Sequence, residues 1–372
     1  MKKILIANDL LVGGGVENVL ENLVRYLLRQ GNEVTLMIPG CTQEQAQALF
    51  GECVTMYPAM RTLQEMKRYS LQWFWDRGLY VLQKQLYRIR FFLRQFDVQI
   101  ALKEGPTMRD LAGLYAKKRL AWVHTDYQYM RWTKGCFRSD KYERKCMMRF
   151  DKVVCVSEST ANSIIQTIGN PGNLCVKYNP LDCKRIHKKA QQPCLVEKGT
   201  AGLLFISVGR LTSQKNYPLL LNVCAELEKK YDFELWIVGD GHDRQALEQM
   251  IQNHQIKSVK LLGNQNNPYP FMKAADIFVS SAVSESYGLA IQEALVLGIP
   301  VVTTECPAIR EVFDTRFGLI VDTDFDALYA AMEKMIRDPE LRKGYQAEIK
   351  QNFKTEDLYE KRLQSICALW EE

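Results

Sequence analysis

The chain has 372 residues, of which 47% are hydrophobic and 25% are charged, and its formal net charge is +6. This composition is typical of a soluble globular protein with two or three domains, and it excludes fibrous and disordered classes. No apolar stretch reaches the ~18 residues of a membrane-spanning helix, and the 11 cysteines contain no CxxC pair, which agrees with a reducing compartment.

The N-terminus begins with two lysines and a short apolar run, as a signal peptide would. Asn8 and Asp9 interrupt that run too early for a secretory leader, so we expect a cytoplasmic protein. Residues 1–175 carry a net charge of +9, with 25 Lys and Arg against 16 Asp and Glu, and the remainder carries −3. The basic half suggests an anionic partner, such as lipid headgroups at the inner face of the membrane or a phosphorylated acceptor. An ordinary solvated surface is the alternative.

Short apolar runs alternate with helical patterns along the whole chain. Runs of this length fit strands buried on both faces of a parallel sheet, and the alternation predicts βαβ units. A stretch rich in Pro, Gly, Lys and Gln, residues 172–202, separates two series and predicts two α/β domains with a cleft between them. The predicted strands are Lys3–Ala7, Val34–Ile38, Val98–Leu102, Leu120–His124 and Val153–Ser157, then Leu203–Val208, Leu235–Val238, Val259–Leu262, Ile277–Ser280, Pro300–Thr303 and Leu319–Val321.

A helix is predicted over residues 78–96. One face carries an apolar stripe that we expect to pack on the core, composed of Leu79, Leu82, Leu86, Ile89, Leu93 and Phe96. The opposite face mixes basic and aromatic residues, namely Arg77, Tyr80, Lys84, Tyr87, Arg88 and Phe91. Such a face suits contact with anionic lipid, and an ordinary solvated face is the alternative.

Two features of the N-terminal half are candidates for a ligand site. Gly14 and Gly15 belong to a glycine-rich turn after the first strand that lacks both the GxGxxG and the P-loop patterns, so it is either a phosphate-approach loop or a tight connection. His124 ends an apolar strand, where either a structural role or a role in the cleft is possible.

In the C-terminal half, Arg210 and Lys215 follow the apolar strand of "LLFISVGRLTSQKN". A guanidinium fork and an ammonium group at the carboxyl end of a strand can neutralise a diphosphate and stabilise charge that develops on it. A pair of solvated loop residues is the alternative.

The segment "SSAVSESYGLAIQEALVLGIPVV", residues 280–302, passes from a strand through a loop into a helix. Gly288 lies where that helix is predicted to begin, so the amides near Gly288 and Leu289 suit an anion. Glu293 lies further along the helix, where its carboxylate could accept hydrogen bonds from two ribose hydroxyls, and Glu285 in the loop could reach a sugar ring. Ligands of open α/β sheets bind at this edge.

With these motifs in order, the chain resembles glycosyltransferase family 4 of the GT-B fold. "GGGVEN", "VHTD", "VSEST" and "KYNPLD" in the first half, and "SVGRLTSQKN", "VGDGHDR" and "SESYGLAIQEAL" in the second, are similar to the signatures of that family. The resemblance implies an α/β protein with two Rossmann-like domains whose parallel sheets face a central cleft. It implies domains at 1–178 and 179–354, with a C-terminal helix at 355–372 that packs back on the first.

The resemblance also implies a role for each candidate residue. Arg210 and Lys215 would hold the donor diphosphate, Glu293 the ribose and Glu285 the transferred sugar. The amides of Gly288 and Leu289 would meet sugar or phosphate, Gly14 and Gly15 would approach the diphosphate from the other domain, and His124 would contact the donor sugar. On the same resemblance, Glu285, His124, Arg210 and Lys215 form the catalytic set.

The implied activity is retaining hexosyl transfer from a nucleotide diphosphate sugar, with UDP the expected nucleotide. The expected acceptor is a saccharide, lipid-linked as in capsule, exopolysaccharide or lipopolysaccharide assembly. Asp322, Asp324 and Asp326 superficially resemble a DxD metal motif, but we interpret them as helix-capping residues and expect no metal or other cofactor. Residues 41–95 match no signature of the family, which leaves the acceptor open. The scattered histidines predict no structural zinc, and we expect no nucleic-acid partner.

Two other functions stay open at this stage. One is a sugar-nucleotide isomerase or hydrolase on the same fold, which would need a further acid and base near the sugar carbons. The other is a non-catalytic subunit that binds a nucleotide-sugar within a membrane assembly.

Overall fold

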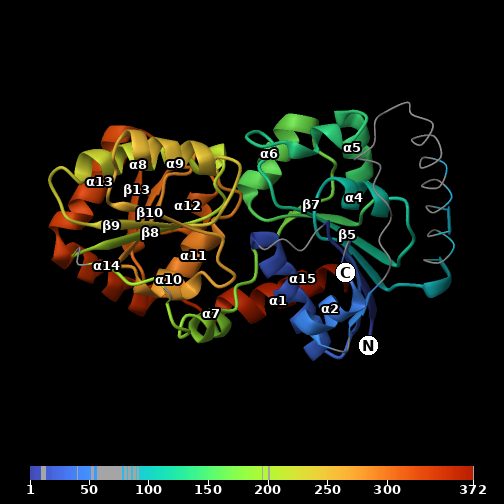
Figure 1. Cartoon of the computed structure of the whole chain (residues 1–372). Coiled ribbons are helices and arrows are strands. Elements are labelled where there is room, and N and C mark those ends of the chain that lie inside the picture. Colours follow the sequence, from blue (N-terminus) through green and yellow to red (C-terminus); the bar gives the residue numbers. More distant parts are fainter. Residues whose placement is uncertain are drawn as a thin grey trace. The chain divides into compact units, whose positions relative to one another are not determined.

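The structure is a computed structural model that describes residues 1–9, 14–39, 41–51, 54–56, 78, 82, 85–86, 89, 92–194, 196–199 and 202–371 (Figure 1). The chain forms two compact units. Unit 1 comprises Met1–Pro180 together with Glu360–Glu372, and unit 2 comprises Leu181–Tyr359. The first division lies two residues beyond the boundary predicted at 178, and the return to unit 1 lies five residues beyond the one predicted at 355.

Unit 1 is built on a seven-stranded sheet with the order β3-β2-β1-β4-β5-β6-β7, in which every pairing is parallel. Its central strands are apolar because helices cover both faces of the sheet. The strands are β1 (Lys3–Ala7), β2 (Glu33–Met37), β3 (Val54–Met56), β4 (Val98–Ala101), β5 (Lys118–Val123), β6 (Lys152–Cys155) and β7 (Leu174–Val176).

The helices of unit 1 lie on the two faces of its sheet (Figure 1). On one face are α4 (Pro106–Leu111), α5 (Asp140–Met147) and α6 (Glu158–Ile168), which pack on alternate side chains of the central strands. On the other are α1 (Gly15–Arg29), α2 (Gln43–Phe50) and the C-terminal α15 (Arg362–Cys367). Thr42, Ser139 and Ser157 cap the amino ends of α2, α5 and α6 by accepting backbone N–H bonds, as hydroxyl side chains do at N-caps.

The structure corrects one prediction about the helix expected over residues 78–96. Leu82, Leu86, Ile89 and Leu93 are between 53% and 73% exposed, so the stripe that we expected to pack on the core faces outward. Of that stripe, only Phe96 is buried among the described residues. The 3-4-3-4 spacing shows that these side chains share one face of a helix, but the spacing contains no information on what that face meets. Leu79 and the six basic and aromatic residues predicted for the opposite face lie outside the described residues.

Unit 2 contains a six-stranded, all-parallel sheet with the order β10-β9-β8-β11-β12-β13. Its strands are β8 (Leu204–Val208), β9 (Glu234–Val238), β10 (Val259–Gly263), β11 (Ile277–Ser280), β12 (Val301–Thr304) and β13 (Gly318–Val321). Alternate residues of each central strand belong to two separate hydrophobic clusters, one on each face of the sheet.

Helices cover both faces of this second sheet as well (Figure 1). α8 (Tyr217–Leu227), α9 (Arg244–Asn253) and α13 (Phe325–Arg337) contribute to one cluster, and α7 (Cys183–Lys189), α10 (Tyr269–Ala274) and α11 (Leu289–Val296) to the other. The short α12 (Ile309–Val312) and the longer α14 (Pro339–Asn352) complete the unit. Asp324 accepts the backbone N–H of Ala327 at 2.8 Å at the start of α13, which confirms its predicted capping role.

All eleven predicted strands are present, with ends within two residues of the predicted ones. The two strands that the sequence did not predict, β3 and β7, have three residues each and form the two edges of the first sheet. The expected fold class, two Rossmann-like units with parallel sheets, is confirmed. Among the helices described, none is both long enough and apolar enough to cross a bilayer.

Candidate functional site

In unit 2, the strand order reverses between β8 and β11. From β8 the chain adds β9 and then β10 on one side of the sheet. After β10 it crosses back, and β11 lies beside β8 on the other side. The loops after β8 and β11 therefore leave the sheet in different directions, and the crevice at such a switch point is where open α/β sheets bind ligands. Arg210 and Lys215 follow β8, and Glu285, Gly288 and Glu293 follow β11, so the sheet assembles both predicted groups at one edge.

These two loops are hydrogen-bonded to each other. The backbone N–H of Val283 donates to the carbonyl of Gln214 at 3.0 Å, and the Gln214 amide donates to the carbonyl of Ser284 at 2.8 Å. The hydroxyl of Ser281 donates to the carbonyl of Lys215 at 2.8 Å. Because three bonds join segments about 70 residues apart, the loops are held in place before any ligand arrives.

Lys215 and Glu285 form a direct ion pair. Lys215 Nζ lies 2.5 Å from Glu285 Oε1, and the two side chains are 20% and 12% exposed. Arg210 is exposed and has no ion-pair partner among the described residues. The loop after β8 thus presents one cation that is engaged with a carboxylate and one that is available to an anion.

Gly288 permits the turn into α11. Its φ of 73° lies in the left-handed region, and an added Cβ would come within 2.9 Å of Ile309 Cδ1, so a glycine suits this position on two grounds. α11 then begins at Leu289. Its first backbone bonds run from the N–H groups of Ile291 and Gln292 to the Gly288 carbonyl, so the amides of Leu289 and Ala290 have no acceptor within the helix. Together with the helix dipole, these amides favour an anion at the end of β11.

Glu293 has partners different from those of Glu285. It is buried on α11, and the phenol of Tyr269 donates to its Oε1 at 2.9 Å. The ammonium of Lys189 lies 6.0 Å from the centre of the Tyr269 ring. Burial raises the pKa of Glu293 to about 7, while the Tyr269 hydrogen bond and the charge of Lys189 act in the opposite direction. The sequence did not predict Tyr269, because nothing in its own segment marks it as a partner of residue 293.

The three predicted residues of unit 1 lie at the carboxyl edge of its own sheet. Gly14 and Gly15 begin α1 directly after the loop that follows β1, and His124 follows β5. His124 Nε2 lies 2.9 Å from the Leu102 carbonyl, and because a carbonyl only accepts, this nitrogen carries the proton. Burial lowers the pKa of His124, so the ring is neutral and its Nδ1 is an acceptor.

Glu104 supports His124 and is a residue that sequence reasoning missed. Its fully buried carboxylate accepts the backbone N–H of His124 at 3.0 Å, the hydroxyl of Thr125 at 2.8 Å and the indole N–H of Trp132 at 3.0 Å. It fixes the loop after β5 to the end of β4. The signal was available, since "LKEG" places a charged pair and a glycine directly after an apolar strand.

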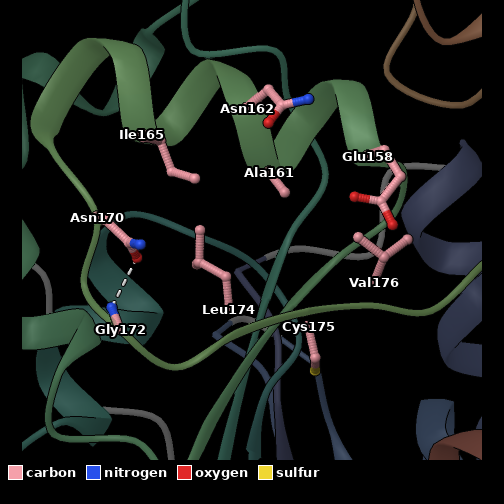
Figure 2. A pocket seen from close by; sticks show the side chains of 9 residues that line it. All are labelled: Glu158, Ala161, Asn162, Ile165, Asn170, Gly172, Leu174, Cys175 and Val176. Atoms are coloured by element: carbon pink, nitrogen blue, oxygen red, sulfur yellow. Dashed lines mark hydrogen bonds between the residues drawn. The ribbon is translucent and has the colours of Figure 1, made fainter.

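Figure 2 shows a pocket of about 370 Å³ elsewhere in unit 1, between α6 and β7. Asn170 and Gly172 close one side through a 2.8 Å hydrogen bond, and Ile165, Leu174 and Val176 contribute apolar side chains. None of the predicted site residues lines it. Within the part of the chain that the structure describes, no group of three or more metal-ligating side chains is found.

Two family models match the chain in succession. The model described as "Glycosyltransferase Family 4" matches residues 13–185, and the one described as "Glycosyl transferases group 1" matches residues 196–352. The two ranges fall on the two α/β halves and together cover most of the sequence.

Curated relatives match over part of their length. The N-acetylgalactosamine-N,N'-diacetylbacillosaminyl-diphospho-undecaprenol 4-alpha-N-acetylgalactosaminyltransferase of Campylobacter jejuni is 30% identical over 212 residues, which is 56% of each chain. The lipopolysaccharide core biosynthesis glycosyltransferase LpsE of Rhizobium meliloti is 32% identical over 37% of this chain and 40% of its own. The chain thus spans about half the length, or less, of these two relatives.

Solved structures match over the whole chain. HepE of Anabaena, in complex with UDP and glucose, has a TM-score of 0.73 at 17% identity and covers 99% of this chain and 100% of its own. TarM has a TM-score of 0.77 at 12% identity, with 100% and 99% covered. These structural similarities support the fold, while the two successive family models and the relatives above indicate the family. The chain therefore belongs to the GT-B glycosyltransferases, with a Glycosyltransferase Family 4 region followed by a Glycosyl transferases group 1 region.

Proposed function

We propose that this protein is a retaining glycosyltransferase that moves a hexose-type sugar from a UDP-sugar to a saccharide acceptor. The observation that carries the proposal is the arrangement at the switch point of unit 2, where Arg210, the Lys215–Glu285 pair, the start of α11 and the buried Glu293 surround the ends of β8 and β11. HepE, whose fold is similar, holds UDP and glucose, which supports the choice of nucleotide and sugar.

Each group then has a chemical task. Arg210 and Lys215 bind the diphosphate and stabilise the charge that develops on it as the bond to the sugar breaks. The free amides of Gly288 and Leu289 add hydrogen bonds to sugar or phosphate. Glu293 accepts the ribose hydroxyls, and Glu285 accepts a hydroxyl of the transferred sugar while it remains beside Lys215.

Retention of the anomeric configuration is the course that the family resemblance implies. In a front-face reaction the acceptor oxygen bonds to the anomeric carbon on the side that the diphosphate leaves, and its proton passes to the departing phosphate oxygen. Such a reaction needs no protein base. In unit 1 we assign the neutral Nδ1 of His124 to a hydroxyl of the donor sugar, and Gly14 and Gly15 to the approach of the diphosphate.

We further propose a lipid-linked saccharide as the acceptor, in the assembly of a cell-surface polysaccharide such as capsule or lipopolysaccharide. The Campylobacter jejuni relative is named for a diphospho-undecaprenol-linked substrate, and LpsE for lipopolysaccharide core biosynthesis. Both names support an acceptor of this class.

Peripheral contact with the inner face of the cell membrane follows from such an acceptor, and we assign it to the exposed apolar stripe of Leu82, Leu86, Ile89 and Leu93. The test is flotation with phosphatidylglycerol vesicles at low salt. Leu86→Glu combined with Leu93→Glu should abolish binding, whereas Leu49→Glu, at another exposed leucine of unit 1, should not. Equal flotation of all these proteins would refute the assignment.

The donor site is tested by thermal-shift screening against UDP- and GDP-sugars, followed by calorimetry. Arg210→Ala and Glu293→Ala should each weaken donor binding several-fold or more, and Glu285→Ala should abolish transfer. Unchanged donor affinity in the first two variants would refute the site. Incubation with donor alone separates the other functions, because an isomerase would yield a new nucleotide-sugar and a scaffold would release no UDP even with acceptor present.

A further inference from the structure

Three helices of unit 2 meet on one face of its sheet, next to the Glu293 carboxyl group. α7, α10 and α11 share one hydrophobic cluster, to which Ile186, Met272 and Ala294 contribute (Figure 1). Glu293 lies on α11 and is 6% exposed, while Tyr269 begins α10 and is 7% exposed. Water hardly reaches this carboxyl group, so the side chains of the neighbouring helices determine its orientation and its charge.

The Glu293 side chain has one hydrogen-bond partner. The phenol of Tyr269 donates to its Oε1 at 2.9 Å, and among the residues that the structure describes no other group donates to this carboxylate. An ionised carboxylate accepts about four hydrogen bonds through its two oxygens. Oε2 is therefore left for donors that the folded chain does not supply, and the hydroxyl groups of a ribose are donors of this kind.

Asn267 joins the two chain segments that approach Glu293. Its Nδ2 donates to the carbonyl of Lys189 at 2.9 Å, and its Oδ1 accepts the backbone N–H of Tyr269 at 3.3 Å. The same Nδ2 donates to Gln192 Oε1 at 2.8 Å, beyond the end of α7. One amide thus holds Lys189 and Tyr269 next to each other, and the Lys189 ammonium lies 6.0 Å from the centre of the Tyr269 ring.

Lys189 supplies the positive charge that acts on Glu293. This charge and the Tyr269 hydrogen bond both favour the ionised carboxylate, against the burial that raises the pKa of Glu293 to about 7. β11 and β12, on which α11 packs, contain no titratable side chain. The remaining titratable side chains of α7 and α10, none of which shifts the pKa of Glu293, are Cys183, Lys184, Arg185, His187, Lys188 and Lys273.

We propose that Tyr269 and Lys189 are positioning residues for ribose binding: Tyr269 fixes the Glu293 carboxylate so that Oε2 stays available to the ribose hydroxyls, and Lys189 keeps that carboxylate ionised. Both residues act through Glu293. A protonated carboxyl group would accept fewer hydrogen bonds from ribose, so orientation and charge are both needed. The proposal rests on the proposed function, in which Glu293 binds the ribose, and it adds the two residues that prepare Glu293 for this contact.

The test compares the affinities of the full chain for UDP and 2′,3′-dideoxy-UDP by calorimetry. The two ligands have the same base and the same diphosphate, so the ratio of their affinities isolates the contribution of the ribose hydroxyls. In Tyr269→Phe the affinity for UDP should fall about fivefold or more, whereas the affinity for dideoxy-UDP should stay unchanged. Tyr231→Phe is the matched control and should change neither affinity, because Tyr231 also donates to a carboxylate of unit 2, Glu333 Oε1, at 2.9 Å.

Lys189→Met adds a measurement that a purely structural role would not change. Loss of this charge should raise the pKa of Glu293 further, so the midpoint of the affinity ratio as a function of pH should move to higher pH. At pH 9 the ratio should return to that of the unmodified protein, because Glu293 is then ionised in both. Lys230→Met is the control and should not move the midpoint, although Lys230 also lies 5.4 Å from the centre of a tyrosine ring of unit 2, that of Tyr329.

The outcomes separate this proposal from the proposed function. Equal losses of UDP and dideoxy-UDP affinity in Tyr269→Phe, no loss of UDP affinity in that variant, or an unmoved midpoint in Lys189→Met would each overturn the proposal. A ratio of one in the unmodified protein, or an unchanged ratio in Glu293→Ala, would instead refute the assignment of Glu293 to ribose. Thermal unfolding of every variant verifies that it is folded.

Discussion

Glu293→Gln should change how the stability of the protein depends on pH. Burial raises the pKa of Glu293 from an ordinary 4.5 to about 7 in the folded chain. Each pKa unit corresponds to ~1.4 kcal/mol, so ionising this side chain costs about 3 kcal/mol more in the folded than in the unfolded state. The folded state binds the proton more tightly. The stability that this tighter proton binding gives the folded state is therefore fully present below pH 4.5 and is lost as the pH rises to about 7. A neutral glutamine removes this loss.

The measurement is urea unfolding between pH 5 and pH 8, followed through Trp236, which is the only tryptophan between residues 181 and 359. Relative to Glu293→Gln, the unmodified protein should lose about 3 kcal/mol of unfolding free energy across this range. Glu340→Gln is the control, because Glu340 is 81% exposed and its removal should leave the pH dependence unchanged. Parallel curves for the unmodified protein and Glu293→Gln would refute the argument that burial of this carboxyl controls the dependence.

Three further outcomes test the same unit. Ribose binding by the ionised form of Glu293 predicts that UDP affinity, measured by calorimetry, rises about 10-fold between pH 6 and pH 8, because the ionised fraction of a group with a pKa of about 7 rises by that factor. Glu293→Gln should remove this rise. Gly298→Ala should cost about 1 kcal/mol in urea unfolding, since its φ is left-handed and an added Cβ meets nothing. Gly288→Ala should cost more, because an added Cβ would also press on Ile309, and only this variant, at the proposed diphosphate site, should weaken UDP binding. Lys215→Met should lower UDP affinity about 10-fold or more. Lys198→Met, which removes the 2.8 Å ion pair between Lys198 Nζ and Asp276 Oδ2 in the same unit, should leave UDP affinity unchanged.

The strands were predictable because of their composition. A strand buried on both faces has to be apolar along its length, and runs such as Ile277–Ser280 and Lys3–Ala7 have the bounds that the sequence predicted. β3 and β7 were not predicted, because a three-residue strand at the edge of a sheet needs no apolar run. The ligand-site loops were predictable in part, since a glycine with charged residues directly after an apolar run is unusual in a connection that only joins a strand to a helix.

Partners across the chain were not predictable. The spacing of Leu82 and Leu86 shows that they share a face, but their exposure depends on which elements pack nearby. Tyr269 donates to a carboxylate 24 positions away, and that contact requires the packing of α10 against the same face of the sheet as α11. Glu104 could have been predicted from the sequence, because it follows an apolar run directly, as the predicted site residues do.

Topology explains why chemistry gathers at one edge of each sheet. Lys215 meets Glu285 and Asp9 meets Thr107 because the strands before them are neighbours at the two switch points, although the members of each pair lie 70 and 98 positions apart. Loops at the opposite, amino ends of the strands also contain ion pairs, such as Asp97 with Lys117, yet the crevice of an open α/β sheet lies outside the carboxyl ends. Substitutions at the two edges should therefore differ in kind. Those after β1, β4, β8 and β11 should alter the binding of sugars and nucleotides, while those at the amino ends should alter stability alone.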